Sequence, residues 1–293
     1  MLEGLLPPSL AVVALGLLAS LGWGISDFGG GLASRHAPVL GVLCVSQAAG
    51  LVLALPLLAV RAEPAMSSQD LLIAIAGGAG AAAGLGLLYR GLSLGRMGVV
   101  APVAGVLTAA VPVGFGIAVQ GTPPPGAVLG IALAVVAVVL VSRVPGDDTA
   151  ASRGSARSGF LMGLGAGVGF GLFAIFASQL SDGLFVGPVI VIRAMAVTFV
   201  VVAALLGRRS LRVPRRLVPA LVGVGGVDMT ATALYLAAIE IGPLAIAAVL
   251  TGLYPVVTVL LAALVLRERI TVMHGIGIAL AGLAITLITV ATT

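Results

Sequence analysis

The chain has 293 residues, of which 60% are hydrophobic and only 9% are charged. A soluble domain carries about 25% charged residues because its surface must face water, so this composition excludes an ordinary soluble protein. The formal charge of +5 comes from arginines that lie singly or in small groups between apolar runs. This pattern indicates membrane topology rather than binding to nucleic acid.

Ten apolar segments follow one another along the chain, and a bilayer span needs about 20 such residues. They cover residues 10–33, 38–60, 69–89, 97–118, 125–142, 158–180, 184–206, 216–238, 244–266 and 272–291. We interpret the first as a permanent span rather than a signal peptide, because no basic residue precedes it. The predicted fold class is an all-α membrane protein with ten transmembrane helices.

The arginines are distributed unevenly between the predicted loops. With ten spans, the loops on one side hold 13 of the 15 basic residues, while the other side holds only Arg61. The 13 are Arg35, Arg90, Arg96, Arg143, Arg153, Arg157, Arg208, Arg209, Arg212, Arg215, Arg216, Arg267 and Arg269. Arginine-rich loops stay in the cytoplasm. We therefore expect a protein of the inner (plasma) membrane with both termini on the periplasmic or extracellular side.

A polar linker divides the predicted spans into two groups of five. Residues 1–145 form the first expected five-helix repeat, residues 146–157 a cytoplasmic linker, and residues 158–293 the second repeat. Thr108 and Thr251 each follow a leucine and precede a proline by four residues, and Gln47 matches Arg193. Because five is an odd number, the two repeats are expected in opposite orientations, as in many transporters.

Several short motifs occur in a recognisable order along the chain. They are Gly22-Trp23-Gly24, its weak echo Gly169-Phe170-Gly171, Pro188 followed by Arg193, Tyr235-Leu236-Ala237-Ala238, Leu253-Tyr254-Pro255-Val256, Glu268, Gly275 and Gly282. This set resembles the EamA-like family of the drug/metabolite transporter superfamily over nearly the whole chain. The resemblance implies a ten-helix fold with a central cavity between the halves, and transport of amino acids, other metabolites or drugs. The first half departs from the pattern at Gln47 and at residues 121–125, which replace the acidic turn around Glu268.

Charged side chains inside spans are costly and mark candidate functional positions. Asp27 shares a face of the first span with Trp23, and its carboxylate could bind a cation or carry a proton; a solvated helix end is the alternative. Arg193 lies within the seventh span. It could hold a substrate carboxylate through bidentate hydrogen bonds, or it could be a structural partner of Asp228 or of helix carbonyls. The resemblance favours a structural or gating role, because the family has a similar arginine.

Polar and aromatic residues complete the predicted site. Asp228, Thr232 and Tyr235 are spaced i, i+4 and i+7, which places them on one helix face. Aromatic faces can stack on a substrate or a cation, and Pro102, Pro112 and Pro255 are expected to kink their helices. The predicted substrate-binding set is Trp23, Asp27, Gln47, Tyr89, Arg193, Asp228, Thr232, Tyr235, Thr251 and Tyr254, with Thr108 and Gln179 as further candidates.

The predicted function is secondary transport of small metabolites, amino acids or similar compounds, in the direction of export. No ATP-binding loop, metal-ligand spacing or cofactor motif occurs in the sequence, so no enzymatic activity and no cofactor are expected. The expected partners are a small-molecule substrate and the lipid bilayer, with a proton gradient as one option for coupling; no nucleic acid is expected. Both a monomer and a homodimer remain open. The alternative is a membrane-embedded enzyme or a lipid-handling protein.

Overall fold

The structure, a computed structural model, describes residues 7–60, 63–93, 97–141, 153–267 and 271–292. Within them the chain forms eleven α-helices and one short 3-10 helix, residues Arg215–Leu217. The first half contributes α1 (Pro8–Ser34), α2 (Val39–Val60), α3 (Ser68–Ser93), α4 (Met97–Gln120) and α5 (Pro125–Val141). The second half contributes α6 (Arg153–Ala177), α7 (Val186–Leu206), α8 (Val218–Ile241), α9 (Leu244–Thr251), α10 (Tyr254–Val265) and α11 (Val272–Thr292).

The prediction of an all-α membrane protein is confirmed. Among the described residues, nine segments are long and apolar enough to cross a membrane, and α5 is a shorter apolar helix of 17 residues. Helix α6 begins at Arg153, earlier than the predicted span, because no proline interrupts the residues between Arg153 and the apolar run. Part of the predicted linker and Glu268 lie outside the described residues.

The ninth predicted span consists of two helices, α9 and α10, which are separated at Gly252 and Leu253. Pro255 has no N–H, so the carbonyl of Thr251 loses its helical partner at this point. In the first half, α4 carries two prolines and is nevertheless one continuous helix. The break therefore belongs to the second half alone within the part of the chain that is described.

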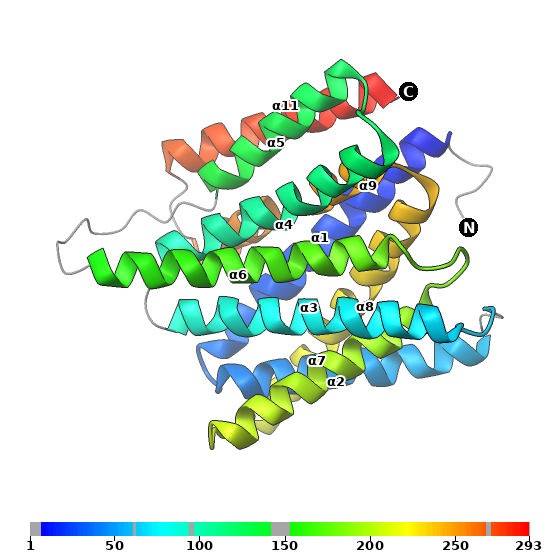
Figure 1. The fold of residues 1–293 in the computed structure, drawn as a ribbon. Coiled ribbons are helices and arrows are strands. Elements are labelled where there is room, and N and C mark those ends of the chain that lie inside the picture. Colours follow the sequence, from blue (N-terminus) through cyan, green and yellow to red (C-terminus); the bar gives the residue numbers. More distant parts are fainter. Residues whose placement is uncertain (1–6, 61–62, 94–96, 142–152, 268–270, 293) are drawn as a thin grey trace.

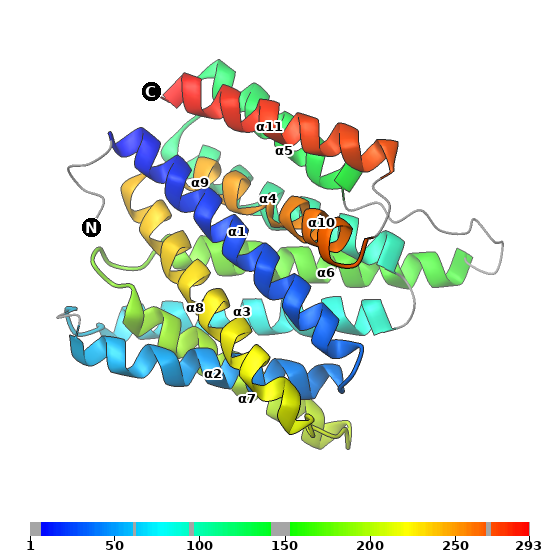
Figure 2. The ribbon, with the colours of Figure 1, turned by 180° about the vertical axis from the view of Figure 1, so that it is seen from behind.

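Helices of the two halves alternate in the bundle (Figure 1). Helix α1 packs on α8 and α6 packs on α3; α2 packs on α7, and α5 lies along α11 at one edge of the molecule in both views (Figure 2). Helix α4 packs on α6, as α9 and α10 pack on α1. Exchanging the halves converts α1–α8 into α3–α6 and α4–α6 into the contacts of α9 and α10 with α1, and it leaves α2–α7 and α5–α11 unchanged. Inverted repeats require such a pattern, although the repeat relation itself stays a prediction.

Two glycines at corresponding places in the halves allow very close helix crossings. A Cβ on Gly24 of α1 would lie 2.4 Å from the Cβ of Val257 in α10. A Cβ on Gly171 of α6 would lie 2.5 Å from the Cβ of Val111 in α4. Small residues are favoured where membrane helices touch. The glycines of the two matching Gly-aromatic-Gly motifs therefore make corresponding contacts in the two halves.

The described arginine loops gather at one end of the bundle, which we call the arginine end. Arg35 follows α1, Arg208 to Arg216 lie between α7 and α8, and Arg267 follows α10. The start of α1 and the end of α11 lie together at the other end (Figure 1), which we call the terminal end. This separation matches the uneven distribution of arginines along the sequence.

Candidate functional site

A central cavity of about 190 Å³ lies between the two halves of the chain. Its lining comes from α1, α2, α3 and α4 of the first half and from α6, α7, α8, α9 and the start of α10 in the second. A buried water needs about 10–15 Å³ of such space, so the cavity holds on the order of ten waters or one small metabolite. None of its described lining residues belongs to α5 or α11.

The structure brings most of the predicted site residues together at this cavity. Those that line it are Trp23, Asp27, Gln47, Arg193, Asp228, Thr232, Tyr235, Thr251 and Tyr254, and the candidate Thr108 joins them. The side chain of Tyr89 lies outside the described part of the chain. The candidate Gln179 is not among the lining residues: it follows α6 at the terminal end, where its amide donates to the Ser178 hydroxyl at 3.2 Å. The roles of the lining residues in transport stay predictions.

A hydrogen-bonded network centred on Arg193 joins the two halves at the cavity wall. Nη1 of Arg193 donates to Oε1 of Gln47 at 2.6 Å and to the Asp228 carboxylate. Nη2 donates to the Asp228 carbonyl at 3.0 Å and to the Thr232 hydroxyl at 2.5 Å. The Gln47 amide in turn donates to the Asp228 carboxylate at 3.1 Å. Gln47 lies on α2 and its matching residue Arg193 on α7, so the residues matched between the halves are direct partners.

The guanidinium of Arg193 is already paired within this network. A guanidinium has five N–H groups, and the four on Nη1 and Nη2 are all used. The fifth, on Nε, is buried and has no partner among the described residues. Arg193 is only 5% exposed. The structure therefore favours the structural alternative for Arg193, and the Asp228 carboxylate is its counter-ion.

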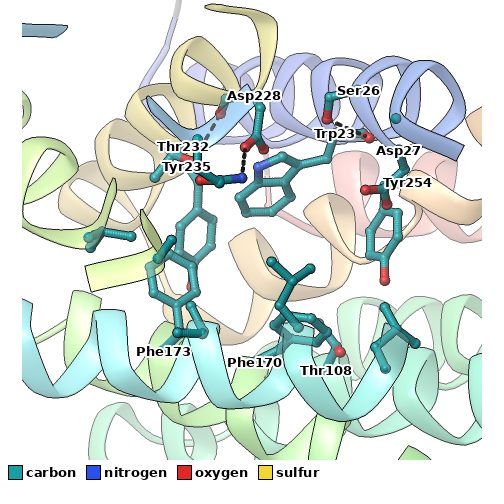
Figure 3. Close-up of a pocket in the computed structure, with 18 of the residues that line it drawn as sticks. Trp23, Ser26, Asp27, Thr108, Phe170, Phe173, Asp228, Thr232, Tyr235 and Tyr254 are labelled. Carbon is teal, nitrogen blue, oxygen red and sulfur yellow. Dashed lines mark hydrogen bonds between the residues drawn. The ribbon is translucent and has the colours of Figure 1, made fainter. Parts of the chain in front are cut away.

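Asp27 is in a different situation. Its side chain is exposed and lines the cavity, beside Tyr254 (Figure 3). It has no hydrogen bond or ion pair with any described residue. Trp23 lies one turn earlier on the same face of α1. Asp27 is therefore the one charged group of the described cavity lining without a partner of opposite sign.

Aromatic rings form much of the remaining wall. The ring centroids of Trp23 and Tyr235 are 5.5 Å apart, and those of Phe173 and Tyr235 are 5.9 Å apart. The Tyr235 hydroxyl is buried and has no hydrogen-bond partner within the described structure. The sequence analysis did not select Phe170 and Phe173, which also line the cavity. Phe170 and Phe173 are spaced i, i+3 on α6, which places them on one helix face. This spacing in the sequence could have identified them as candidate lining residues.

The terminal end of the bundle is closed by acceptors that bind backbone N–H groups of the α6–α7 loop. Asp70 of α3 accepts from Ser181 N at 3.0 Å, and Glu240 of α8 accepts from Gly183 N at 2.8 Å. Glu63, which precedes α3, accepts from Val186 N at 2.9 Å. The bonds to Asp70 and Glu63 are partly buried and the bond to Glu240 is exposed. These contacts connect three elements across this end of the molecule.

Comparison with known proteins agrees with this architecture. The family model described as "EamA-like transporter family" matches residues 157–290. This segment, which covers most of the second half of the chain, is therefore similar to that family. Together with the candidate spans of the described residues, this similarity agrees with the predicted multi-pass membrane protein.

One solved structure shows the same fold. It is titled only "Crystal structure of protein", shares 16% sequence identity, and aligns with a TM-score of 0.75 over 94% of this chain and 95% of its own. Among curated proteins, no sequence matches this chain. The similarity to EamA-like transporters therefore rests on the family model alone, and the solved structure shows the fold; neither names a substrate.

Proposed function

We propose that this EamA-like protein is a secondary transporter that exports small metabolites of about amino-acid size by alternating access between two inverted repeats. The observation that carries the proposal is the cavity, which takes its lining from helices of both halves. A site at such an interface is exposed to one side of the membrane and then to the other when the halves rock against each other. The predicted orientation places the arginine end in the cytoplasm.

The position of the cavity supports an arrangement that is open toward the arginine end. On α1 and α2 the lining reaches Gly30 and Val42, close to the helix ends that face the arginine loops. At the terminal end, the carboxylates of Asp70, Glu63 and Glu240 hold the α6–α7 loop in place. Alternating access requires these contacts to break when the other state forms.

The proposal is tested by filling the cavity. Ala81 of α3 lines the cavity, whereas Ala83, two residues later, is exposed on the outside of the helix. We expect Ala81→Phe to reduce transport to the level of empty liposomes, because the phenyl ring would occupy the substrate space. Ala83→Phe adds the same ring toward lipid and should leave transport intact.

The measurement has two steps. A panel of labelled metabolites is first tested for export from cells that overexpress the protein, and the compounds that are exported are then tested with purified protein in proteoliposomes. Equal flux through the Ala81→Phe variant and the wild type would contradict a transport route through this cavity. The absence of flux for every compound in the panel would contradict transport itself.

A second prediction concerns the closed terminal end. Replacing Asp70 with asparagine removes a charged acceptor from Ser181 N and from the N–H and hydroxyl of Ser67. We expect amide hydrogen exchange of the 178–187 segment to become about ten- to hundredfold faster, since a lost charged hydrogen bond corresponds to about 1.5–3 kcal/mol. Exchange in residues 207–217 at the arginine end serves as the internal reference. Unchanged protection in the 178–187 segment would show that these bonds do not hold the end closed.

A further inference from the structure

The charges that line the cavity do not balance. Asp27, Arg193 and Asp228 are the charged residues of the described lining. Arg193 and Asp228 form an ion pair and cancel each other. With Asp27 ionised, the described lining carries a net charge of −1. A charged side chain that faces a cavity inside a membrane protein is a candidate binding position, so Asp27 is the place where the described lining would attract a cation or a proton.

The described cavity lining offers no available cation that could pair with a substrate carboxylate. Arg193 is the one cation among the described lining residues, and its terminal N–H groups already bind Gln47, Asp228 and Thr232. Its remaining N–H on Nε is buried and has no partner among the described residues. Moving the guanidinium toward a ligand would leave Asp228 as an uncompensated charge, which is strongly unfavourable. A free carboxylate on the substrate would therefore find no available counter-ion among the described lining residues.

The surfaces around Asp27 suit the apolar body of an organic cation. Trp23 shares its helix face, and Tyr254 lies beside it (Figure 3). The rings of Phe170, Phe173 and Tyr235 continue the same wall. Aromatic faces attract a cation within about 6 Å, and tryptophan does so best. Charge and shape thus point to the same class of ligand.

We propose that the substrates are organic monocations with an aromatic or apolar body and no free carboxylate, bound with the cation at Asp27 and the body against Trp23. This proposal rests on the proposed transport function, and it narrows the substrate class expected from the sequence. Amines of amino-acid size satisfy it, and zwitterionic amino acids do not. When no substrate is bound, a proton can take the place of the cation on Asp27.

The test uses the only tryptophan of the chain, Trp23, as the reporter. Its fluorescence is followed in the purified full-length protein during titration with 2-phenylethylamine, phenylalanine and 3-phenylpropionate. These probes share a phenyl ring on a two-carbon chain and carry net charges of about +1, 0 and −1 at neutral pH, as the usual amine and carboxyl pKa values dictate. We expect saturable binding of 2-phenylethylamine with an affinity at least about tenfold above that of the other two probes.

The matched variants are Asp27→Asn and Asp182→Asn. Asp182 is exposed in the α6–α7 loop and does not line the central cavity. We expect Asp27→Asn to weaken binding of 2-phenylethylamine at least about tenfold and Asp182→Asn to leave it unchanged. If the Asp27→Asn variant does not fold, the order of the affinities of the three probes for the wild-type protein tests the proposed substrate class by itself.

The proposal is overturned if 2-phenylethylamine gives no response, if phenylalanine or 3-phenylpropionate binds as tightly, or if folded Asp27→Asn keeps full affinity. Flux measurements in proteoliposomes separate this failure from failure of the transport function. Flux of phenylalanine without flux of 2-phenylethylamine would contradict the proposed substrate class and still support the transport function. Binding of 2-phenylethylamine at Asp27 without flux of any compound would support the proposed ligand class and contradict the transport function.

Discussion

Replacing Arg193 with methionine is expected to lower the stability of the folded protein by about 3–5 kcal/mol. The substitution removes the cation and leaves the Asp228 carboxylate in the wall of the cavity without its ion-pair partner. It also removes the donors to Gln47 and Thr232, so that one hydrogen bond between α2 and α7 and one between α7 and α8 are lost. Loss of one partner from a buried pair is far more costly than loss of both.

The matched control is the double variant Arg193→Met with Asp228→Asn. It contains no unpaired charge at this place, and we expect it to recover most of the stability that Arg193→Met loses. Thermal unfolding of the detergent-solubilised protein, followed by the fluorescence of Trp23 and by size-exclusion chromatography, measures the difference. A double variant that is as unstable as Arg193→Met would show that charge compensation is not what the network provides.

Replacing Gly225 with alanine is expected to destabilise the protein by about 3 kcal/mol or more, at the upper end of the range for overpacking. An added Cβ would lie 2.1 Å from the carbonyl oxygen of Ser46 and 2.9 Å from the backbone nitrogen of Gly50. Both contacts are with the backbone of α2, which cannot rotate away as a flexible side chain can. The crossing of α2 and α8 would have to widen, and Gln47 would move away from Asp228.

Gly223 supplies the control for this prediction on the same helix. A Cβ at Gly223 meets nothing within 4 Å, and alanine is favoured over glycine inside a helix by about 0.5–1 kcal/mol. Gly223→Ala should therefore be neutral or slightly stabilising. Unfolding of both variants in detergent with added denaturant gives the comparison. Equal stability of the Gly225→Ala variant and the wild type would mean that the α2–α8 crossing tolerates expansion.

The Arg193→Met and Gly225→Ala predictions both concern the place where α2, α7 and α8 meet. The Arg193 network connects α2, α7 and α8 through side chains, and the Gly50–Gly225 contact brings the backbones of α2 and α8 together. A Cβ on Gly50 would also lie 3.6 Å from Cδ of Arg193. The close helix crossing thus places the guanidinium within reach of its acceptors. If the halves move during transport, this region is where the motion has to be accommodated.

The membrane-spanning architecture could be predicted from the sequence because its causes are local. A span needs about 20 apolar residues, and every predicted span overlaps a helix or, for the ninth, a pair of helices. The arginine distribution follows from the fact that successive loops lie on alternate sides of the membrane. In the structure the described arginine loops gather at one end. Local chemistry named Pro102, Pro112 and Pro255 together as candidate kinks, and the structure shows a break only before Pro255 within the described residues.

The residues of the site were predicted in the same way, from polar or aromatic side chains inside apolar runs. What the sequence alone left open was which of these charges are paired. Asp27 and Asp228 are both aspartates in spans, yet one faces the cavity without a partner and the other is bound by Arg193. That difference depends on the packing of α2, α7 and α8, which are far apart in the sequence. Because the partners of a side chain are decided by helix crossings rather than by its neighbours in the chain, only the tertiary structure distinguishes the available carboxylate from the structural one.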